Sequence, residues 1–322
     1  MTHQLVVSII NYRTADMTLD CVRSVLEDIG ELDVQVVIVD NCSEDGSEQK
    51  LTDWIAAQPD RTPVHLVSSN TNSGFSGGHN QGMAAMPATH YLLLNSDARV
   101  LPGCLSALLT EARTNPDAGL YAPQIEHEDG TIQGSCFRFH TPFSEFIRGA
   151  NSGPVTKVLK RWNVPLGTDP DPRQIGWASF ACIMLDERMV RDIGPMDEGY
   201  FLYFEDAEYC LRAHRAGWRV QHCPNARMIH FRGGSAPVKS LAKARARLPA
   251  YYYSSRTRFF FQAYGHLGLW AANLMWAAGR ILALGRRLMG RHSDNAKASE
   301  GHDIWTNIFR PLGPSYAPAD RS

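Results

Sequence analysis

The sequence predicts an α/β protein with a Rossmann-like, mostly parallel β-sheet covered by helices on both faces. Short apolar runs rich in β-branched residues alternate with segments of helical periodicity from residue 5 to about residue 122. This alternation is typical of parallel sheets, whose crossover connections are helices. At 44% hydrophobic and 20% charged residues, the 322-residue chain can bury a large core, which excludes a disordered or collagen-like protein.

The first half of the chain supplies most of this pattern. Leu5–Asn11 and Val34–Asp40 are apolar runs, as expected of strands buried on both faces. Met17–Ile29 repeats its apolar residues every three to four positions, which predicts an amphipathic helix. The other elements predicted here are helices over Glu48–Ala57, Gly82–Met86 and Leu105–Asn115, and strands over Val64–Ser69, Tyr91–Leu94 and Leu120–Ala122.

Beyond Pro123 the alternation ends. Glu126–Gln133 contains an Asp-Gly turn and predicts a hairpin. Residues 141–173 are rich in Gly, Pro and Asp and predict a long loop facing the active site. The elements predicted after it are strands over Trp177–Leu185, Val220–Pro224 and Arg227–Phe231, helices over Asp186–Ile193 and Glu205–Ala216, a basic helical region over 240–290 and a docking segment over Ile304–Phe309.

Charge is distributed unevenly along the chain. Residues 1–208 hold 29 acidic and 14 basic residues, whereas residues 209–293 hold 15 basic residues and none that is acidic. Two interpretations stay open: an anionic partner for the basic stretch, or basic side chains that pair with the acidic half. The seven scattered cysteines favour free thiols in a reducing compartment, and the first residues lack the basic region of a secretory signal, so we expect a cytoplasmic protein.

The segment Leu267–Gly279 is uncharged but is followed at once by Arg280. A spanning helix needs about 20 apolar residues, so this stretch is too short. Trp270, Trp276 and the pair Arg286–Arg287 favour a helix lying in a membrane interface, and the alternative is an ordinary helix packed on the first domain.

Polar residues follow three of the predicted strands, where parallel sheets bind ligands. Asp40 and Asn41 follow the second strand, and Asn95-Ser96-Asp97 follows Tyr91–Leu94. A carboxylate there can accept from a nucleobase N–H or hold a hard divalent cation, but both segments are also good turn chemistry. The glycine- and asparagine-rich segment Asn70–Gly82 permits close backbone approach to a phosphate or sugar, or is a flexible loop.

Two further motifs lie in the second half. Glu205, Asp206 and Glu208 begin a helix directly after two aromatic residues. The aromatic side chains would partly desolvate the carboxylates and so raise the basicity of these groups. The alternative is that the three acidic residues only complement the helix dipole. His230 ends a strand and is a metal-ligand candidate, although a lone histidine is more often structural. A zinc site is conceivable but matches no zinc-binding spacing; its members would be Cys210, His214, His222, Cys223 and His230.

Taken together and in this order, seven segments resemble the inverting family 2 glycosyltransferases, rhamnosyltransferase-like branch. The resemblance covers about residues 4–260 and implies a GT-A fold, of the nucleotide-diphospho-sugar transferase type, with a C-terminal helical extension. The segments are 5–13, 37–47, 72–82, 92–97, 177–185, 194–218 and 230–235.

The resemblance also assigns roles to individual residues. Asp206 is the expected catalytic base, with Glu205 beside it, and Asp97 and His230 are the expected ligands of Mg²⁺ or Mn²⁺. Metal dependence is a question, because the D-x-D position reads Asn95-Ser96-Asp97. The residues expected to bind the nucleotide and donor are Asn11, Tyr12, Asp40, Asn41, Asn72, Gly74, Asn80, Asn95, Asp97 and Trp177.

The resemblance implies three domains and a reaction. Residues 1–235 would be the catalytic domain (donor half about 1–123, acceptor half about 124–235), 236–292 a basic amphipathic extension and 293–322 a tail. The enzyme would move a sugar, rhamnose among the candidates, from a dTDP- or UDP-linked donor to a glycan or polyprenyl-diphosphate-linked acceptor in cell-surface polysaccharide synthesis. An anionic membrane surface is a candidate partner, met by Arg245, Arg247, Arg256 and Arg258, which would place the protein on the inner face of the cytoplasmic membrane.

Other classes fit less well. A non-catalytic sugar-nucleotide or glycan-binding module on a retired transferase fold is the main alternative, and a retired copy would be expected to have lost one of Asp40, Asp97, Asp206 or His230. A nucleic-acid binder lacks a reading module and has an acidic front half. A Rossmann dehydrogenase is excluded because NYRTAD, not a Gly-rich turn, follows the first strand.

Overall fold

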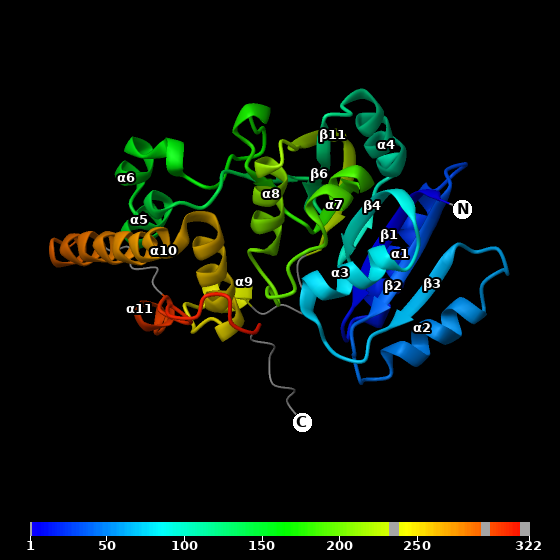
Figure 1. The fold of residues 1–322 in the computed structure, drawn as a ribbon, viewed down its shortest axis with the longest axis horizontal. Helices are drawn as coiled ribbons and strands as arrows, with labels where there is room; N and C mark the ends of the chain where they lie inside the picture. The colour runs from blue at the N-terminus through cyan, green and yellow to red at the C-terminus, as the bar shows by residue number, and fades with distance from the viewer. Residues whose placement is uncertain (1, 232–237, 291–296, 316–322) are drawn as a thin grey trace.

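In the computed structural model, which describes residues 2–231, 238–290 and 297–315, nine strands form one sheet. Its strand order is β3-β2-β1-β4-β10-β6-β11-β5, with β7 paired to β6. The strands β3, β2, β1 and β4 run parallel, whereas β10 is antiparallel to both of its neighbours. The sheet is therefore mixed: a parallel half, as the alternation predicts, joined through β10 to a second half (Figure 1).

The elements follow in chain order. The strands are β1 His3–Asn11, β2 Val34–Asp40, β3 Val64–Ser68, β4 Ala88–Asn95, β5 Ala98–Val100, β6 Ala118–Glu126, β7 Ile132–Gln133, β8 Cys136–Phe137, β9 Trp177–Ala178, β10 Cys182–Asp186 and β11 Arg219–His230. The helices are α1 Ala15–Asp28, α2 Ser47–Ala56, α3 Gly74–Ala84, α4 Cys104–Thr114, α5 Pro142–Ala150, α6 Gly153–Val158, α7 Glu187–Ile193, α8 Glu205–Arg215, α9 Val238–Lys243, α10 Ala250–Leu288 and α11 Glu300–Asp303, with short 3-10 turns over Lys160–Trp162 and Pro172–Gln174.

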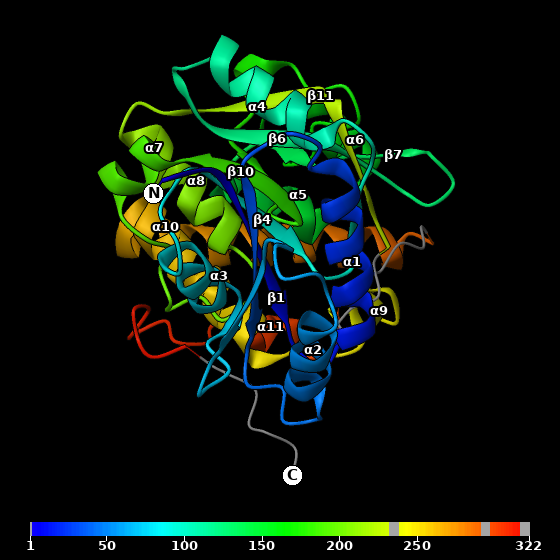
Figure 2. The same cartoon turned by 90° about the vertical axis from the view of Figure 1, so that its right-hand side faces the viewer.

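Helices cover both faces of the sheet, as predicted. The first face packs against α1, α2 and α4, and the second against α3, α7 and α8. Alternate residues of β1 divide between the two cores: Leu5, Val7 and Ile9 face α1, and Val6 faces α3. Figure 2 shows α1 and α3 on opposite sides of β1.

The Asn-Gly segment is not the flexible loop that was one of its two interpretations. Helix α3 begins at Gly74, so most of the segment is helical, and its glycines serve close packing on the sheet. A Cβ at Gly78 would lie 2.7 Å from the Ile10 side chain, and one at Gly82 would lie 2.1 Å from the Ser8 hydroxyl. The predicted helix Gly82–Met86 is therefore the end of a longer one.

The predicted loop over 141–173 is also wrong, because helices α5 and α6 lie within it. Thr141 starts α5 with a capping box to Ser144, and Pro142 occupies the first turn. Elsewhere the predicted hairpin is present as β6 and β7, and the two predicted strands over 220–231 are one bulged strand, β11. The predicted strand Trp177–Leu185 is two strands: β9 pairs with β8 in a separate small sheet, and β10 joins the main one.

The C-terminal helices pack on the side of the molecule away from β1–β3, where α10 lies along α5 (Figure 1). Gly265 kinks α10, with φ 67° and ψ −171°, a combination that glycine alone adopts readily. Helix α10 crosses α5 at backbone contact: a Cβ at Gly149 would lie 2.3 Å from the Trp276 carbonyl oxygen, and one at Gly279 would lie 2.4 Å from that of Phe146. Described residues of the C-terminal segment, 297–315, bond to α10 through Thr257 and Asn273.

Several bases of the acid-free stretch pair with carboxylates from other regions. Arg256 is 1% exposed and bonds to Glu145, and Arg258 bonds to Asp197, so these two arginines do not face outward to meet phosphates as expected. Arg247 pairs with Asp303. Other pairs join Arg212 to Glu208, Arg219 to Asp117 and Arg227 to Glu126. The interpretation in which basic residues pair within the fold thus accounts for much of the asymmetry.

Three sequence expectations reach beyond the described residues. The motif 230–235 is described only to Phe231, and the domain boundaries expected at 235/236 and 292/293 also lie outside the described ranges.

Candidate active site

The first cluster of the candidate site joins the ends of β1 and β2. Asn11 and Asp40 are paired in register, and the Asn11 amide donates to Asp40 Oδ1 at 2.6 Å and to the Ser43 hydroxyl at 3.0 Å. Ser43 donates to the same Asp40 oxygen at 2.6 Å. Asn11 Oδ1 accepts from the Thr18 hydroxyl, so both polar atoms of the Asn11 side chain are hydrogen-bonded within the protein. This network fixes the Asp40 carboxylate, which is 3% exposed.

The loops after these strands have unusual backbone conformations. Arg13, Cys42 and Glu44 adopt φ angles of 58°, 59° and 53°, in the left-handed region. Arg13 donates through Nε to the Ser43 carbonyl, and its guanidinium lies 5.1 Å from the ring centre of Tyr12. Clustered left-handed residues other than glycine cost free energy and concentrate at functional sites.

Asn41 ties the same strand end to the start of α3. Its amide donates to Asn72 Oδ1 at 3.1 Å and to the Gly74 carbonyl at 3.0 Å, and its oxygen accepts from the Ser73 N–H. Asn80, on α3, donates to the Met196 carbonyl and accepts from the Met196 N–H. Asn41 and Asn80 are therefore held as positioning residues between segments of the chain.

Gly74 links α3 to the segment that precedes α8. Its φ is 69°, and a Cβ there would lie 2.2 Å from the Phe201 carbonyl oxygen, which accepts from the Phe75 N–H at 2.8 Å. The start of α3 is thus in backbone contact with residue 201, four positions before Glu205.

Gly74→Ala should therefore damage folding and activity together. The left-handed φ and the backbone clash predict a loss of about 1–3 kcal/mol in unfolding free energy, seen in a chemical denaturation curve. Gly153→Ala is the matched control, because a Cβ there meets no atom within 4 Å. Equal stability of the two variants would contradict the contact.

The second cluster lies at the end of β4. Asn95 donates its N–H to the Ala181 carbonyl, and the Ser96 hydroxyl lies 3.2 Å from that of Thr14, which joins this cluster to the first. The carboxylate of Asp97, 9% exposed, lies 3.2 Å from His230 Nε2. The pairing of β5 with β11 brings the two together, since Ala98 is opposite His230.

These two side chains fit a divalent cation. His230 Nε2 and the Asp97 oxygen, 3.2 Å apart, are as close as two ligands of one ion. In the described part of the chain no group of three or more His, Cys, Asp or Glu side chains is arranged for a metal. A cation here would keep positions for water and phosphate oxygens, as Mg²⁺ does in nucleotide enzymes. The zinc cluster considered from the sequence is not present among these residues.

The third cluster is the start of α8. Tyr203 and Phe204 both adopt left-handed φ angles, 70° and 67°, and turn the chain into the helix at Glu205. Glu205 is 6% exposed and its Oε2 has no partner among the described residues, whereas Asp206 accepts from the Ala207 N–H at 2.8 Å. Burial raises the pKa of both carboxyls, that of Asp206 to about 7, and the Asp206 charge raises the pKa of Glu205 further.

Glu208 belongs to a different environment, because it pairs with Arg212 at 2.7 Å. Its pKa is also raised by burial, against the opposing Arg212 charge. Of the three acidic residues that open α8, Glu205 and Asp206 therefore have no basic partner among the described residues.

Glu205→Gln should stabilise the protein at alkaline pH. The pKa of Glu205 is higher in the folded than in the unfolded chain, so the contribution of Glu205 to stability is fully present below pH about 4.5 and is lost as pH rises through the folded-state pKa. The Gln variant lacks this loss. Its Tm, relative to wild type, should be higher at pH 8.5 than at pH 5; a difference independent of pH would contradict the buried, protonated carboxyl.

Aromatic rings border this carboxylate pair. The Trp177 ring stacks on Phe137 with centres 4.2 Å apart, and its indole N–H donates to the Arg138 carbonyl. His140 lies 5.8 Å from Trp177 and 5.0 Å from Phe204, and burial lowers its pKa to about 4. Trp177 therefore adjoins the third cluster. His140 was missed by sequence reasoning, since nothing in its surrounding residues signals a site.

Contacts connect the three clusters into one region of the molecule. Thr14 links the first to the second, and Asn41, Gly74 and Phe201 link the first to the segment leading into the third. The region thus contains a fixed carboxylate, a close Asp–His pair and a carboxyl with pKa near 7.

Comparison with known proteins finds glycosyltransferases similar to this chain. The family model described as "Glycosyl transferase family 2" matches residues 6–156. The N-acetylglucosaminyl-diphospho-decaprenol L-rhamnosyltransferase of Mycobacterium tuberculosis is 28% identical over 82% of this chain and 85% of its own. The dTDP-rhamnosyl transferase RfbF of Shigella flexneri is 22% identical over 80% of each chain.

Two solved structures share the fold. The mannosyltransferase PcManGT of Pyrobaculum calidifontis, solved with GDP-Man and Mn²⁺, superposes with a TM-score of 0.54 at 15% identity, over 97% of this chain and 85% of its own. GalNAc-T7, solved with UDP, GalNAc and Mn²⁺, gives a TM-score of 0.59 at 13% identity over 96% of this chain, which spans 55% of the length of that structure.

Proposed function

The chain is a glycosyltransferase of family 2 with the GT-A fold, and we propose that it transfers rhamnose, with inversion, from a dTDP- or UDP-linked donor to a lipid-linked glycan. The observation that carries the mechanism is the Asp206 carboxyl, partly exposed at the start of α8 with its pKa raised to about 7. A base of that pKa is balanced between accepting and releasing a proton at neutral pH. The names of two relatives support rhamnose.

The proposed reaction is a single displacement. Asp206 accepts the proton of the acceptor hydroxyl while the oxygen of that hydroxyl bonds to the anomeric carbon of the donor sugar. The bond from that carbon to the nucleoside diphosphate breaks in the same step. Attack opposite the leaving group inverts the anomeric centre. Glu205, held neutral by burial, leaves a single negative charge at the pair and so keeps Asp206 available as the base.

The strand ends would bind the donor. Asp40, fixed by Asn11 and Ser43, would accept from the pyrimidine N–H, with Tyr12 beside it, and Asn72, Gly74 and Asn95 would line the nucleotide site. Asp97 and His230 would hold a divalent cation, which when bound offsets the charge of the departing diphosphate. Trp177 would shape the sugar pocket.

A stripe of exposed apolar side chains on α10 supports peripheral attachment to a membrane. Leu267, Leu274, Ile281 and Leu288 recur every seven residues and are 87%, 59%, 72% and 90% exposed. By length and composition α10 is also apolar enough to cross a membrane, yet its opposite face packs on α5. Trp276 was expected to lie in the membrane interface, but it is only 7% exposed. The proposed membrane contact therefore depends on the exposed stripe and not on Trp276.

Transfer from candidate donors to a prenyl-diphosphate-linked glycan tests the function. We expect product with inverted anomeric configuration, and ligand-linked stabilisation of about 2.7 kcal/mol at a hundredfold excess of donor over Kd. Donor binding without turnover on any acceptor would favour the non-catalytic sugar-nucleotide module. Flotation with anionic vesicles, comparing wild type with Leu274→Glu/Ile281→Glu, tests the membrane surface; equal flotation of both would overturn it.

A further inference from the structure

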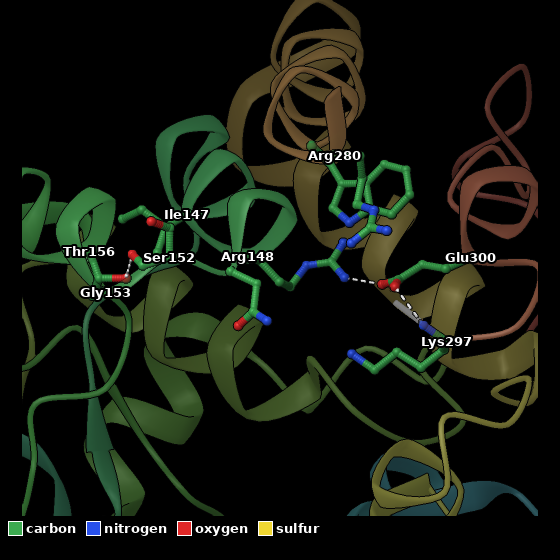
Figure 3. A pocket seen from close by; sticks show the side chains of 10 residues that line it. Ile147, Arg148, Ser152, Gly153, Thr156, Arg280, Lys297 and Glu300 are labelled. Carbon is green, nitrogen blue, oxygen red and sulfur yellow. Dashed lines mark hydrogen bonds and ion pairs between the residues drawn. The ribbon is translucent and has the colours of Figure 1, made fainter. Parts of the chain in front are cut away.

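A cavity of about 380 Å³ lies apart from the three clusters, between α5, α6, α10 and the segment before α11 (Figure 3). Its described lining contains three basic side chains, Arg148, Arg280 and Lys297, and one acidic side chain, Glu300. Asn151 and Thr156 add polar groups, and Trp276 forms part of the wall.

The crossing of two helices places the arginines together. Arg148 is next to Gly149 and Arg280 is next to Gly279, and these glycines are where α5 and α10 touch backbone to backbone. Any larger residue at either glycine would separate the helices and with them the two guanidinium groups. The close approach of like charges is unfavourable unless anions lie between or beside them.

Buried ion pairs hold Arg148 in place. Its guanidinium bonds to Glu145 at 2.6 Å and to Glu300, and the Arg256 guanidinium also bonds to Glu145, at 2.7 Å. Burial alone would raise the pKa of Glu145, but the charges of Arg148 and Arg256 hold it at about 2. The arginine is therefore rigid and needs no ordering when a ligand binds.

Burial and the nearby Arg148 charge lower the pKa of Lys297, while Glu300 opposes that shift. A negatively charged ligand near Lys297 would therefore stabilise the charged ammonium form of this side chain. Guanidinium groups donate paired hydrogen bonds that match phosphate oxygens, and the ammonium group adds a point charge. The lining thus has the chemistry of a phosphate site.

Exposed apolar side chains near the cavity favour a phosphate that carries an apolar chain. Ile281 and Leu284, exposed on α10, lie one and four residues after Arg280, so exposed apolar side chains lie near this part of the cavity lining in the helix. Tyr252 connects the cavity with the carboxylate pair: its ring lies 5.6 Å from that of Phe204, and the charge of Arg148 acts on its hydroxyl.

We propose that this cavity binds the diphosphate group of a prenyl-diphosphate-linked acceptor through Arg148, Arg280 and Lys297. The assignment of the acceptor rests on the proposed function, whereas binding of a diphosphate group rests on the cavity itself.

Calorimetric titration of the full chain with a short, water-soluble prenyl diphosphate, with divalent cations chelated, tests the cavity. Arg280→Gln and Lys297→Gln should each weaken binding about tenfold. Gly153→Glu should do the same, because it adds a negative charge to the lining where a Cβ meets no atom within 4 Å, and Gly153→Gln should bind as wild type does. Arg191→Gln, on the exposed surface of α7, is the matched control.

Inorganic diphosphate and a nucleoside diphosphate identify the source of the group. Weaker binding of both than of the prenyl compound supports the lipid acceptor, and equal binding of inorganic diphosphate supports a free anion in the same cavity. Unchanged affinity in Gly153→Glu and Arg280→Gln would overturn the proposal. If the cavity binds the prenyl compound but no sugar is transferred, the proposed function is wrong and diphosphate binding in the cavity is supported. If transfer occurs with the same acceptor KM in Gly153→Glu as in wild type, the cavity is not the acceptor site and the proposed function is unaffected.

Discussion

Asp206→Asn should reduce kcat for sugar transfer about 10²–10⁴-fold, the usual contribution of a general base, while donor affinity stays within about twofold of wild type. The carboxamide resembles the protonated acid in shape but cannot accept the acceptor proton at neutral pH. The carboxyl is already partly protonated near pH 7 in the wild type, so the variant should fold normally. Rapid-quench turnover and donor titration measure the two effects separately.

The same assignment fixes the sign of the pH dependence. The base acts in its ionised form, so wild-type kcat/KM should rise with pH and level off above an apparent pKa near 7, reported by the pair rather than by one residue. Asp53→Asn, on the exposed side of α2, is the matched control and should keep both rate and profile. Turnover close to wild type in Asp206→Asn would remove Asp206 from the role of base.

The sequence predicted the parallel half of the sheet because its strands are buried on both faces, which makes them continuous apolar runs. It mispredicted α3 because the glycines that mark a loop serve there as contact points for Ile10 and Ser8 on β1. Such a use depends on which strand the helix covers, and no local pattern reports that.

Helix α5 escaped prediction for a different reason. Its buried residues include Glu145, which pairs with Arg148 and Arg256 inside the protein, and Gly149, which touches α10. A charge and a glycine on the inner face disrupt the apolar periodicity by which a helix is predicted. Arg256 and helix α10, which help to make them acceptable, lie more than a hundred residues later in the chain.

The candidate site, too, was predicted from the sequence only in part. Asp97 and His230 were each candidates from their strand-end positions, but only the resemblance combined them into one metal site. Their 3.2 Å separation depends on the pairing of β5 with β11, and β5 was not predicted. The left-handed Tyr203–Phe204 pair explains how two bulky residues precede the carboxylates without extending the helix. His140 comes to Trp177 and Phe204 through tertiary packing, which sequence spacing does not encode.

Asp97→Asn should lower transfer about 10²-fold or more and weaken Mn²⁺ binding in the presence of a nucleoside diphosphate at least tenfold. The change removes the carboxylate of the two proposed protein ligands, and with it the negative charge that they would offer the cation. Metal binding, followed by electron paramagnetic resonance of free Mn²⁺, is a readout independent of turnover. His302→Ala, exposed near α11, controls for general effects of losing a polar side chain. Wild-type Mn²⁺ affinity in both Asp97→Asn and His230→Ala would place the cation elsewhere.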